Sequence, residues 1–133
     1  MLSPKLRANL IQLALEARSR AYCPYSRYQV GAALLGANGV IYGGCNVENA
    51  SYGGTICAER TAVVKAVSEG VRQFSALVVA TANGGSPCGM CRQFLYEFAP
   101  DLLIILIDAA GIVRAEHTLR QLLPYGFGAA NLE

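Results

Sequence analysis

Three cysteines in this 133-residue sequence are spaced as ligands for one metal ion. Cys88 and Cys91 stand three positions apart in a segment with helical character, so their side chains lie on one face. Cys57 opens a second predicted helix and can complete the set. Free N–H groups at a helix start stabilise thiolate, which is the form of cysteine that binds metal. The pattern predicts a three-cysteine zinc site at two helix N-termini.

Glu59 stands two residues after the first of these cysteines. Structural zinc sites have four protein ligands, whereas catalytic sites have three and leave the fourth position for water. Zinc lowers the pKa of that water to about 7, and a carboxylate beside it can accept the proton. We therefore predict that Glu59 is the catalytic acid and base of this site.

The charge of the predicted site calls for a nearby cation. Three thiolates on Zn²⁺ leave a net negative charge, which weakens the ion as a Lewis acid. Arg60 directly follows Glu59, and Arg92 directly follows Cys91. We expect one or both of these arginines to hydrogen-bond thiolate sulfur and withdraw negative charge from the ion.

Two other interpretations of the cysteines remain open. Cys23 or Cys45 could supply a fourth ligand to a structural zinc, although both are more typical of small buried residues. The Cys88–Cys91 pair could instead be a redox pair, which leaves the Cys57-Ala58-Glu59 sequence unexplained. The only histidine, His117, lies far from these motifs in the sequence and is expected to be structural or at the surface.

Hydrophobic periodicity and turn residues place the elements that must position these groups. We expect helices over residues 4–20, over 57–69 with Thr55 as a possible cap, and over 88–98, with a helical turn at 119–123. Strands are expected over residues 28–35, 40–45, 75–81, 102–107 and 112–117. The order predicts an α/β fold, a three-layer α/β/α sandwich around a mixed five-stranded sheet.

Composition limits the classes of protein. The length suits one domain spanning 1–133, and 53% hydrophobic residues can fill its core. Only 15% of residues are charged, against roughly 25% in typical soluble domains, which suggests a surface buried against another subunit. The 11 basic and 9 acidic residues are scattered, so no basic face favours a nucleic-acid polymer.

The same composition bears on location. The longest aliphatic run, Leu102–Ile107, is too short for a membrane span of about 20 residues. Charged residues interrupt every apolar stretch that could form a signal peptide near the N-terminus. We therefore expect a cytoplasmic protein with no membrane partner, whose five cysteines are thiols or metal ligands rather than disulfides.

The Cys57-Ala58-Glu59 and Pro87-Cys88-Gly89-Met90-Cys91 sequences match the zinc-deaminase signature. Nearly the whole chain resembles the small cytidine deaminases that act on free nucleosides. The other stretches that carry this resemblance are Tyr22–Ser26, Val30–Leu34, Gly44–Ala50, Arg60–Ala62 and Leu122–Pro124. The length and the three-cysteine set resemble the homotetrameric branch, and not the larger dimeric branch with a histidine ligand.

The resemblance implies a role for each matching position. Cys57, Cys88 and Cys91 hold one Zn²⁺ per subunit, and Glu59 shuttles protons. Other positions bind the nucleoside: Asn46 and Glu48 at the ribose hydroxyls, the Ala58 backbone N–H at the pyrimidine carbonyl, Tyr28 at the base, and Phe127 over a neighbouring subunit's pocket. Family members usually have phenylalanine where Tyr28 stands.

The implied reaction is hydrolytic deamination of cytidine and 2′-deoxycytidine at C4, with release of ammonia, in pyrimidine salvage. The implied assembly is a homotetramer with active sites at subunit interfaces. One alternative is the same chemistry on another free cytosine compound, such as blasticidin S. A polynucleotide deaminase is disfavoured because the sequence has no basic face, and a structural zinc module is the alternative from another class.

Overall fold

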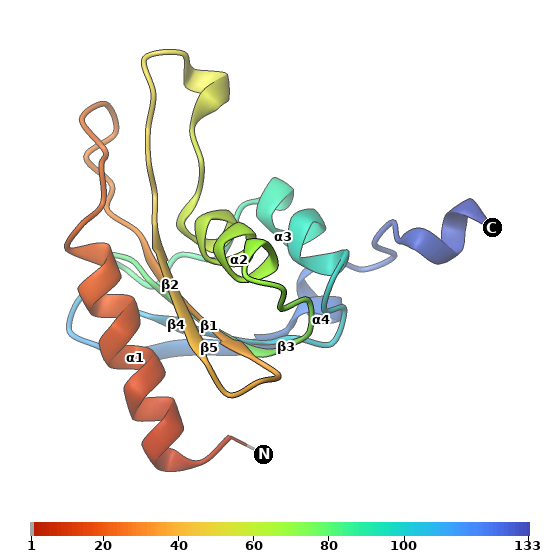
Figure 1. The fold of residues 1–133 in the computed structure, drawn as a ribbon. Helices are drawn as coiled ribbons and strands as arrows, with labels where there is room; N and C mark the ends of the chain where they lie inside the picture. The colour runs from red at the N-terminus through yellow and green to blue at the C-terminus, as the bar shows by residue number, and fades with distance from the viewer. Residues whose placement is uncertain (1) are drawn as a thin grey trace.

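The computed structural model describes residues 2–133 and contains the expected α-β-β-α-β-α-β-β order (Figure 1). The helices and strands, in chain order, are α1 (Pro4–Arg18), β1 (Gly31–Gly36), β2 (Ile41–Cys45), α2 (Ala58–Ser68), β3 (Phe74–Ala80), α3 (Gly89–Tyr96), β4 (Leu103–Ile107), β5 (Val113–Thr118) and α4 (Leu119–Leu122). Two short 3-10 helices, η1 (Tyr52–Gly54) and η2 (Ala129–Leu132), were not expected.

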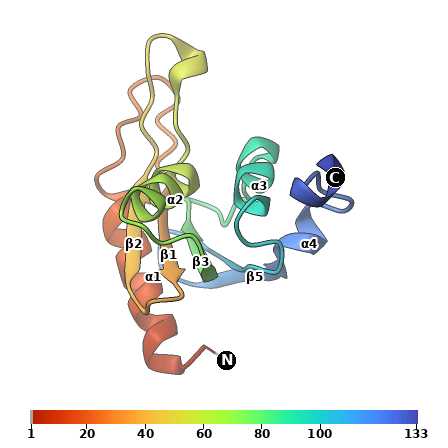
Figure 2. The same cartoon turned by 45° about the vertical axis from the view of Figure 1, so that its right-hand side comes forward.

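The five strands form one mixed sheet in the order β2-β1-β3-β4-β5. Only the β3–β4 pair is parallel, and the other pairs are antiparallel. Side chains alternate across the sheet, so Leu34 and Leu77 pack on the face covered by α2. Ala33 and Val78 pack on the opposite face, against α1. Figure 2 shows these layers, with α2 and α3 together on one side, and the predicted three-layer sandwich is confirmed.

The strand β1 begins at Gly31, three residues later than expected. The reason is the Asn46 side chain, which takes the backbone groups that a neighbouring strand would otherwise use. Its Oδ1 accepts a hydrogen bond from Val30 N at 2.9 Å, and its Nδ2 donates to Tyr28 O at 2.8 Å. The segment from Tyr28 to Val30 is therefore held beside the sheet by one amide side chain.

The helix starts follow local capping chemistry. Ser3 caps α1 by accepting a hydrogen bond from Leu6 N at 3.2 Å, with Pro4 in the first turn as expected. Cys57 stands at the N-cap of α2, so the expectation that Thr55 caps this helix is wrong. The Cys57 side chain makes no capping hydrogen bond, which leaves its sulfur free for another use.

Two helices rest directly on strand backbone. A Cβ atom added to Gly31 would lie 2.1 Å from Ala14 O in α1. A Cβ atom added to Gly44 would lie 2.6 Å from Ala58 O at the start of α2. Glycine at these two positions therefore allows an approach that any side chain would prevent. At Gly44, that approach sets the position of the helix start that follows Cys57.

Among residues 2–133, no helix combines the length and the apolar character needed to cross a bilayer.

Candidate active site

Two connections place the three predicted ligands side by side. The chain from β2 leads to Cys57 at the N-cap of α2, and the chain from β3 leads to Cys88 at the N-cap of α3. Cys91 lies one turn into α3 and is fully buried. Because α2 and α3 cover the same face of the sheet (Figure 2), their N-termini converge on one point.

The spacing of the sulfur atoms fits zinc. The Sγ atoms of Cys57 and Cys88 are 3.8 Å apart, and those of Cys88 and Cys91 are 3.3 Å apart. A tetrahedral ion with Zn–S distances of about 2.3 Å separates its sulfur ligands by about 3.8 Å. Within the described part of the chain, neither Cys23 nor Cys45 belongs to this group. The donor set is thus that of a three-ligand site, which counts against a closed structural zinc.

Glu59 lies beside the cysteine cluster and is only 4% exposed. The pKa of Glu59 is raised to about 7, chiefly because the carboxyl group is buried; repulsion from Cys57 also raises it, while a backbone hydrogen bond and the charge of Arg60 lower it. A carboxyl group with a pKa near neutrality can take up and release protons under working conditions. The geometry therefore suits the predicted role of Glu59 in proton transfer.

Arg60 places a positive charge beside the cysteine cluster. One of its terminal nitrogens donates to Cys57 Sγ at 3.6 Å and to Thr55 O at 3.3 Å. Hydrogen bonds lower the pKa of Cys57 to about 5, the largest effect coming from Cys91, followed by Arg60 and Cys88. Cys57 is therefore a thiolate at neutral pH and ready to bind metal.

Arg92 has a different role from the expected one. It donates to Pro87 O at 2.8 Å, to Leu122 O at 2.7 Å and to Ser86 Oγ at 2.9 Å. The hydrogen bonds of Arg92 in the described structure thus go to oxygen, and the expected contact with thiolate sulfur is absent. The guanidinium joins the segment before Cys88 to the end of α4, and Arg60 alone contacts a ligand sulfur.

A cavity of about 280 Å³ opens onto the cluster. It brings together most of the residues predicted for the site. Its lining consists of Ser26, Tyr28, Val30, Asn46, Glu48, Thr55, Cys57, Ala58, Glu59, Val79, Thr81, Gly85, Ser86 and Cys88. A cavity of this size suits one small molecule. Phe127 is the one predicted substrate-binding residue outside this lining.

Glu48 is fixed at the cavity edge by the loop that precedes β1. Its carboxylate accepts hydrogen bonds from Tyr25 N at 2.9 Å, from Ser26 N at 3.1 Å and from Ser26 Oγ. These bonds, led by the Ser26 hydroxyl, lower the pKa of Glu48. Glu48 is consequently an oriented anion with lone pairs left for a hydroxyl group, and Asn46 lies beside it as a buried amide.

Two aromatic residues predicted for the site lie in different surroundings. Tyr28 lines the cavity, and its hydroxyl donates to Asn83 Oδ1 at 2.9 Å. Phe127 is 53% exposed in the C-terminal segment, where its carbonyl accepts a hydrogen bond from Gln93 Nε2 at 2.7 Å. This segment extends beyond the layers of the sandwich in Figure 1. The ring of Phe127 does not line the cavity of its own chain.

Among the residues that sequence reasoning missed are Thr81 and Gly85, which line the cavity, and Asn83, which contacts the lining residue Tyr28. The sequence gives only a weak indication that these residues belong to the site. These residues follow the carboxyl end of a buried strand, where polar side chains often gather around a ligand site in α/β folds. The contact of Asn83 with Tyr28 joins residues 55 positions apart, so no local sequence pattern predicts it.

Comparison with known proteins identifies the family of the chain. Residues 4–107 match the family described as the cytidine and deoxycytidylate deaminase zinc-binding region. The chain is 48% identical to the cytidine deaminase of Sporosarcina psychrophila, covering 92% of each chain. It is also 48% identical to that of Halalkalibacterium halodurans, covering 95% of this chain and 97% of the relative.

Solved structures give the same result. A crystal structure of cytidine deaminase from Burkholderia pseudomallei matches with a TM-score of 0.85 and 45% identity, covering 90% of this chain and 98% of the other. The cytidine deaminase of Mycobacterium tuberculosis matches with a TM-score of 0.80 and 41% identity, covering 91% and 96%. The chain belongs to the cytidine and deoxycytidylate deaminase family. Its cofactor is zinc, which the three cysteines are placed to hold.

Replacing Arg60 tests the charge argument. We expect Arg60→Gln to reduce turnover by about 10- to 100-fold, because the thiolates would then leave more negative charge on the ion. The fold should persist, as judged by circular dichroism, since Arg60 is a partly exposed residue of α2. Arg72→Gln, an exposed arginine between α2 and β3, is the matched control. Unchanged turnover in Arg60→Gln would refute the charge argument.

Proposed function

We propose that this chain catalyses the zinc-dependent hydrolytic deamination of free cytidine and 2′-deoxycytidine to the uracil nucleosides, with release of ammonia, in pyrimidine salvage. The observation that carries the proposal is a buried Glu59 next to three zinc-spaced sulfur atoms on one side of a nucleoside-sized cavity. The family and the named activity of its relatives support the same reaction. We place this activity in the cytoplasm, where the ligand thiols stay reduced.

Each residue of the cavity has a chemical task in this proposal. When bound, zinc supplies a water molecule that ionises near neutral pH and can attack C4 of the pyrimidine. Glu59 would take up one proton of that water and deliver it to ring N3 as the C4–O bond forms. It would then take the proton of the new C4 hydroxyl and pass it to the amine, so that the C4–N bond breaks, the carbonyl forms and ammonia leaves. This delivery matters because an exocyclic amine is a poor leaving group without a proton.

The cavity also offers groups that bind the nucleoside. Ala58 is the first residue of α2, so its backbone N–H has no partner within the helix and can donate to the pyrimidine carbonyl. Asn46 and Glu48 offer an amide and a carboxylate to the two ribose hydroxyls. The Tyr28 ring lines the same cavity and can pack on the base. These contacts orient C4 toward the cysteine cluster.

The charge of the lining favours a nucleoside over a nucleotide. No lysine or arginine is among the cavity residues given above, and Glu48 contributes a negative charge. A phosphate group on the sugar would therefore meet an anion and no cation. Phosphate sites in proteins use arginine, lysine or a helix N-terminus, and here the N-terminus of α2 carries the metal ligand and Glu59.

Substrate absorbance is the direct test. Purified zinc-loaded protein is expected to remove the ultraviolet signal of cytidine and of 2′-deoxycytidine and to release one ammonia per nucleoside. Cytidine 5′-monophosphate, offered at the same concentration, is expected to react at least tenfold more slowly. If both nucleosides remain unchanged while zinc stays bound, the proposal fails, and other cytosine compounds or a structural zinc become the better reading.

We also propose that the working unit is a homotetramer with active sites at subunit interfaces. Only 15% of the residues are charged, and large aromatic side chains are exposed, including Tyr52, Tyr125 and Phe127. Exposed apolar groups of this size favour a partner surface. The C-terminal segment projects from the sandwich (Figure 1), and in this proposal its exposed Phe127 covers the cavity of a neighbouring subunit.

Light scattering tests the assembly. At micromolar concentration the expected mass is four times the 14.1 kDa of one chain. Phe127→Ala is expected to raise KM for cytidine severalfold, because the cavity would lose an apolar cover. A monomer mass for the wild-type protein would contradict the proposal.

A further inference from the structure

The segment 82–87 links the end of β3 to the zinc ligand Cys88 and forms one wall of the cavity. It contains no helix or strand. Gly84, in the left-handed region with φ +76°, and Gly85 lie in its middle. A segment of this kind keeps one position only if contacts from outside hold it. Those contacts therefore also decide where Cys88 lies.

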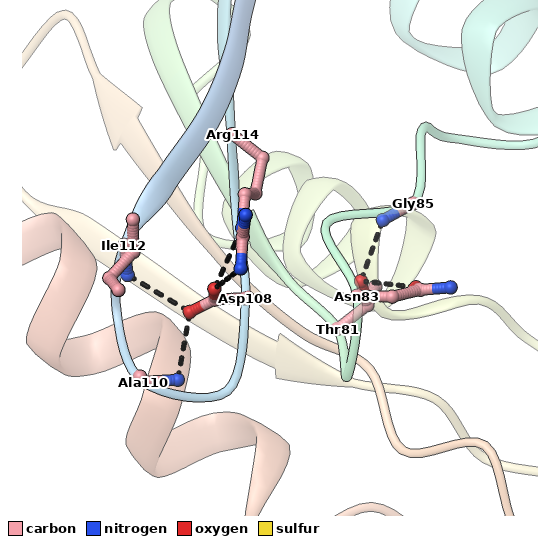
Figure 3. A network of polar contacts seen from close by, with 7 residues as sticks. All are labelled: Thr81, Asn83, Gly85, Asp108, Ala110, Ile112 and Arg114. Atoms are coloured by element: carbon pink, nitrogen blue, oxygen red, sulfur yellow. Dashed lines mark hydrogen bonds and ion pairs between the residues drawn. The ribbon is translucent and has the colours of Figure 1, made fainter.

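The buried end of the segment is held by Thr81. The Thr81 hydroxyl oxygen accepts a hydrogen bond from Gly85 N at 2.8 Å (Figure 3). The same hydroxyl donates a hydrogen bond to Asn83 Oδ1 at 3.4 Å. Thr81 is only 3% exposed. These bonds close a tight turn over residues 81–85.

The outer side of the turn rests on the β4–β5 hairpin. Asp108 accepts from Ala110 N at 2.9 Å, from Ile112 N at 3.1 Å and from Arg114 Nε at 2.8 Å (Figure 3). The stem of Arg114 then lies against Gly84, where an added Cβ would be 2.7 Å from the arginine Cγ. The backbone of Asn83 also forms an isolated antiparallel bridge with Asp108. The hairpin thus supports one side of the turn.

Tyr28 holds the other side, from across the cavity. Its hydroxyl donates to Asn83 Oδ1 at 2.9 Å, the same atom that accepts from Thr81. The hydroxyl also lies 2.8 Å from the place where a Cβ of residue 85 would be, so it sits directly on the Gly85 backbone. The turn is enclosed between the hairpin and this one phenol group.

We propose that the Tyr28 hydroxyl is a positioning group that acts through Asn83 to hold the segment 82–87, and with it Cys88, in the geometry that retains zinc. The ring of Tyr28 can pack on a base without its oxygen, so the hydroxyl has a separate task. This inference rests on the proposed function only for its kinetic consequence. The predicted effect on zinc release depends only on the connection from Tyr28 through Asn83 to Cys88.

The test compares zinc release in Tyr28→Phe, Asn83→Ala and the double variant. Each single variant is expected to release zinc to a chromogenic chelator about three- to tenfold faster, the effect of losing one hydrogen bond, and to lose a similar factor in kcat/KM. The double variant should release zinc no faster than Asn83→Ala alone, because Asn83→Ala already removes the Tyr28 contact together with the Thr81 contact. Asn83→Asp keeps the acceptor oxygen and is expected to restore slow release.

Tyr22→Phe is the matched control, since Tyr22 is an exposed tyrosine outside the cavity lining. Wild-type release in Tyr28→Phe would overturn the inference, and so would losses that add up in the double variant. A wild-type protein that ignores cytidine while the variants still release zinc faster would refute the proposed function and leave the inference in place. If the wild-type protein deaminates cytidine while the variants release zinc at the wild-type rate, the inference is refuted and the proposed function stands.

Discussion

With Glu59 replaced by glutamine, the protein is expected to hold zinc at the wild-type level and to deaminate cytidine at least about 10²- to 10⁴-fold more slowly, the usual contribution of a positioned general acid and base. Glutamine has nearly the shape of glutamate, so the buried position at the start of α2 stays filled. It cannot accept a proton, and the ring nitrogen and the departing amine then lose their proton donor. Absorbance assays and metal analysis on the same sample measure both quantities.

The control for this variant is Glu69→Gln, which removes an exposed carboxylate at the other end of the same helix. It should match the wild-type protein in turnover and in zinc content. If Glu59→Gln kept activity within tenfold of the wild type, proton transfer would have to pass through another group. If it lost zinc together with activity, Glu59 would be needed for the metal site itself.

Removal of a ligand should have the second large effect. Cys91→Ala is expected to lower zinc content from one ion per chain to near zero and to abolish turnover. Cys91 is fully buried, and the group that could hold a metal within the described residues contains only Cys57 and Cys88 besides it, so no other side chain can replace its sulfur. Thermal unfolding should also move to lower temperature, because metal that binds only the folded state stabilises that state.

Cys45→Ala provides the comparison for the ligand variant. Its sulfur donates weakly to Arg20 O and lies outside the group of three, so zinc content and turnover should stay at wild-type values. Chelation of the wild-type protein should reproduce the Cys91→Ala loss of activity, and added zinc should restore it. Turnover by metal-free protein would contradict the assignment of the three cysteines.

The sequence predicted the layers of the fold and the cluster because both depend on local patterns. Helix starts follow from residues three or four positions apart, such as Ser3 with Leu6. Each ligand lies within one turn of a helix start that the sequence marks. Once β2 and β3 deliver these helices to one face of the sheet, the three sulfur atoms meet without further adjustment.

The structure differs from the sequence-based predictions where residues distant in the sequence form hydrogen bonds with each other. The start of β1 moved because Asn46, 16 positions after Val30, takes backbone groups from the strand. One or both of Arg60 and Arg92 were expected at a sulfur atom, and Arg92 instead bonds to Leu122 O, 30 positions away. The partner of the Tyr28 hydroxyl is 55 positions distant. No local pattern encodes contacts of this kind, since they depend on the finished packing.

The seating of α2 on Gly44 has a consequence for how such a chain can change over generations. Apolar side chains in the core between the helix and the sheet can be exchanged for others of similar volume with modest cost. Position 44 has no such freedom, because even one methyl group would push against the Ala58 carbonyl and displace the helix start beside Cys57. Mutational libraries should therefore accept substitutions of similar volume at buried apolar positions of α2 such as Val63, and none at this glycine.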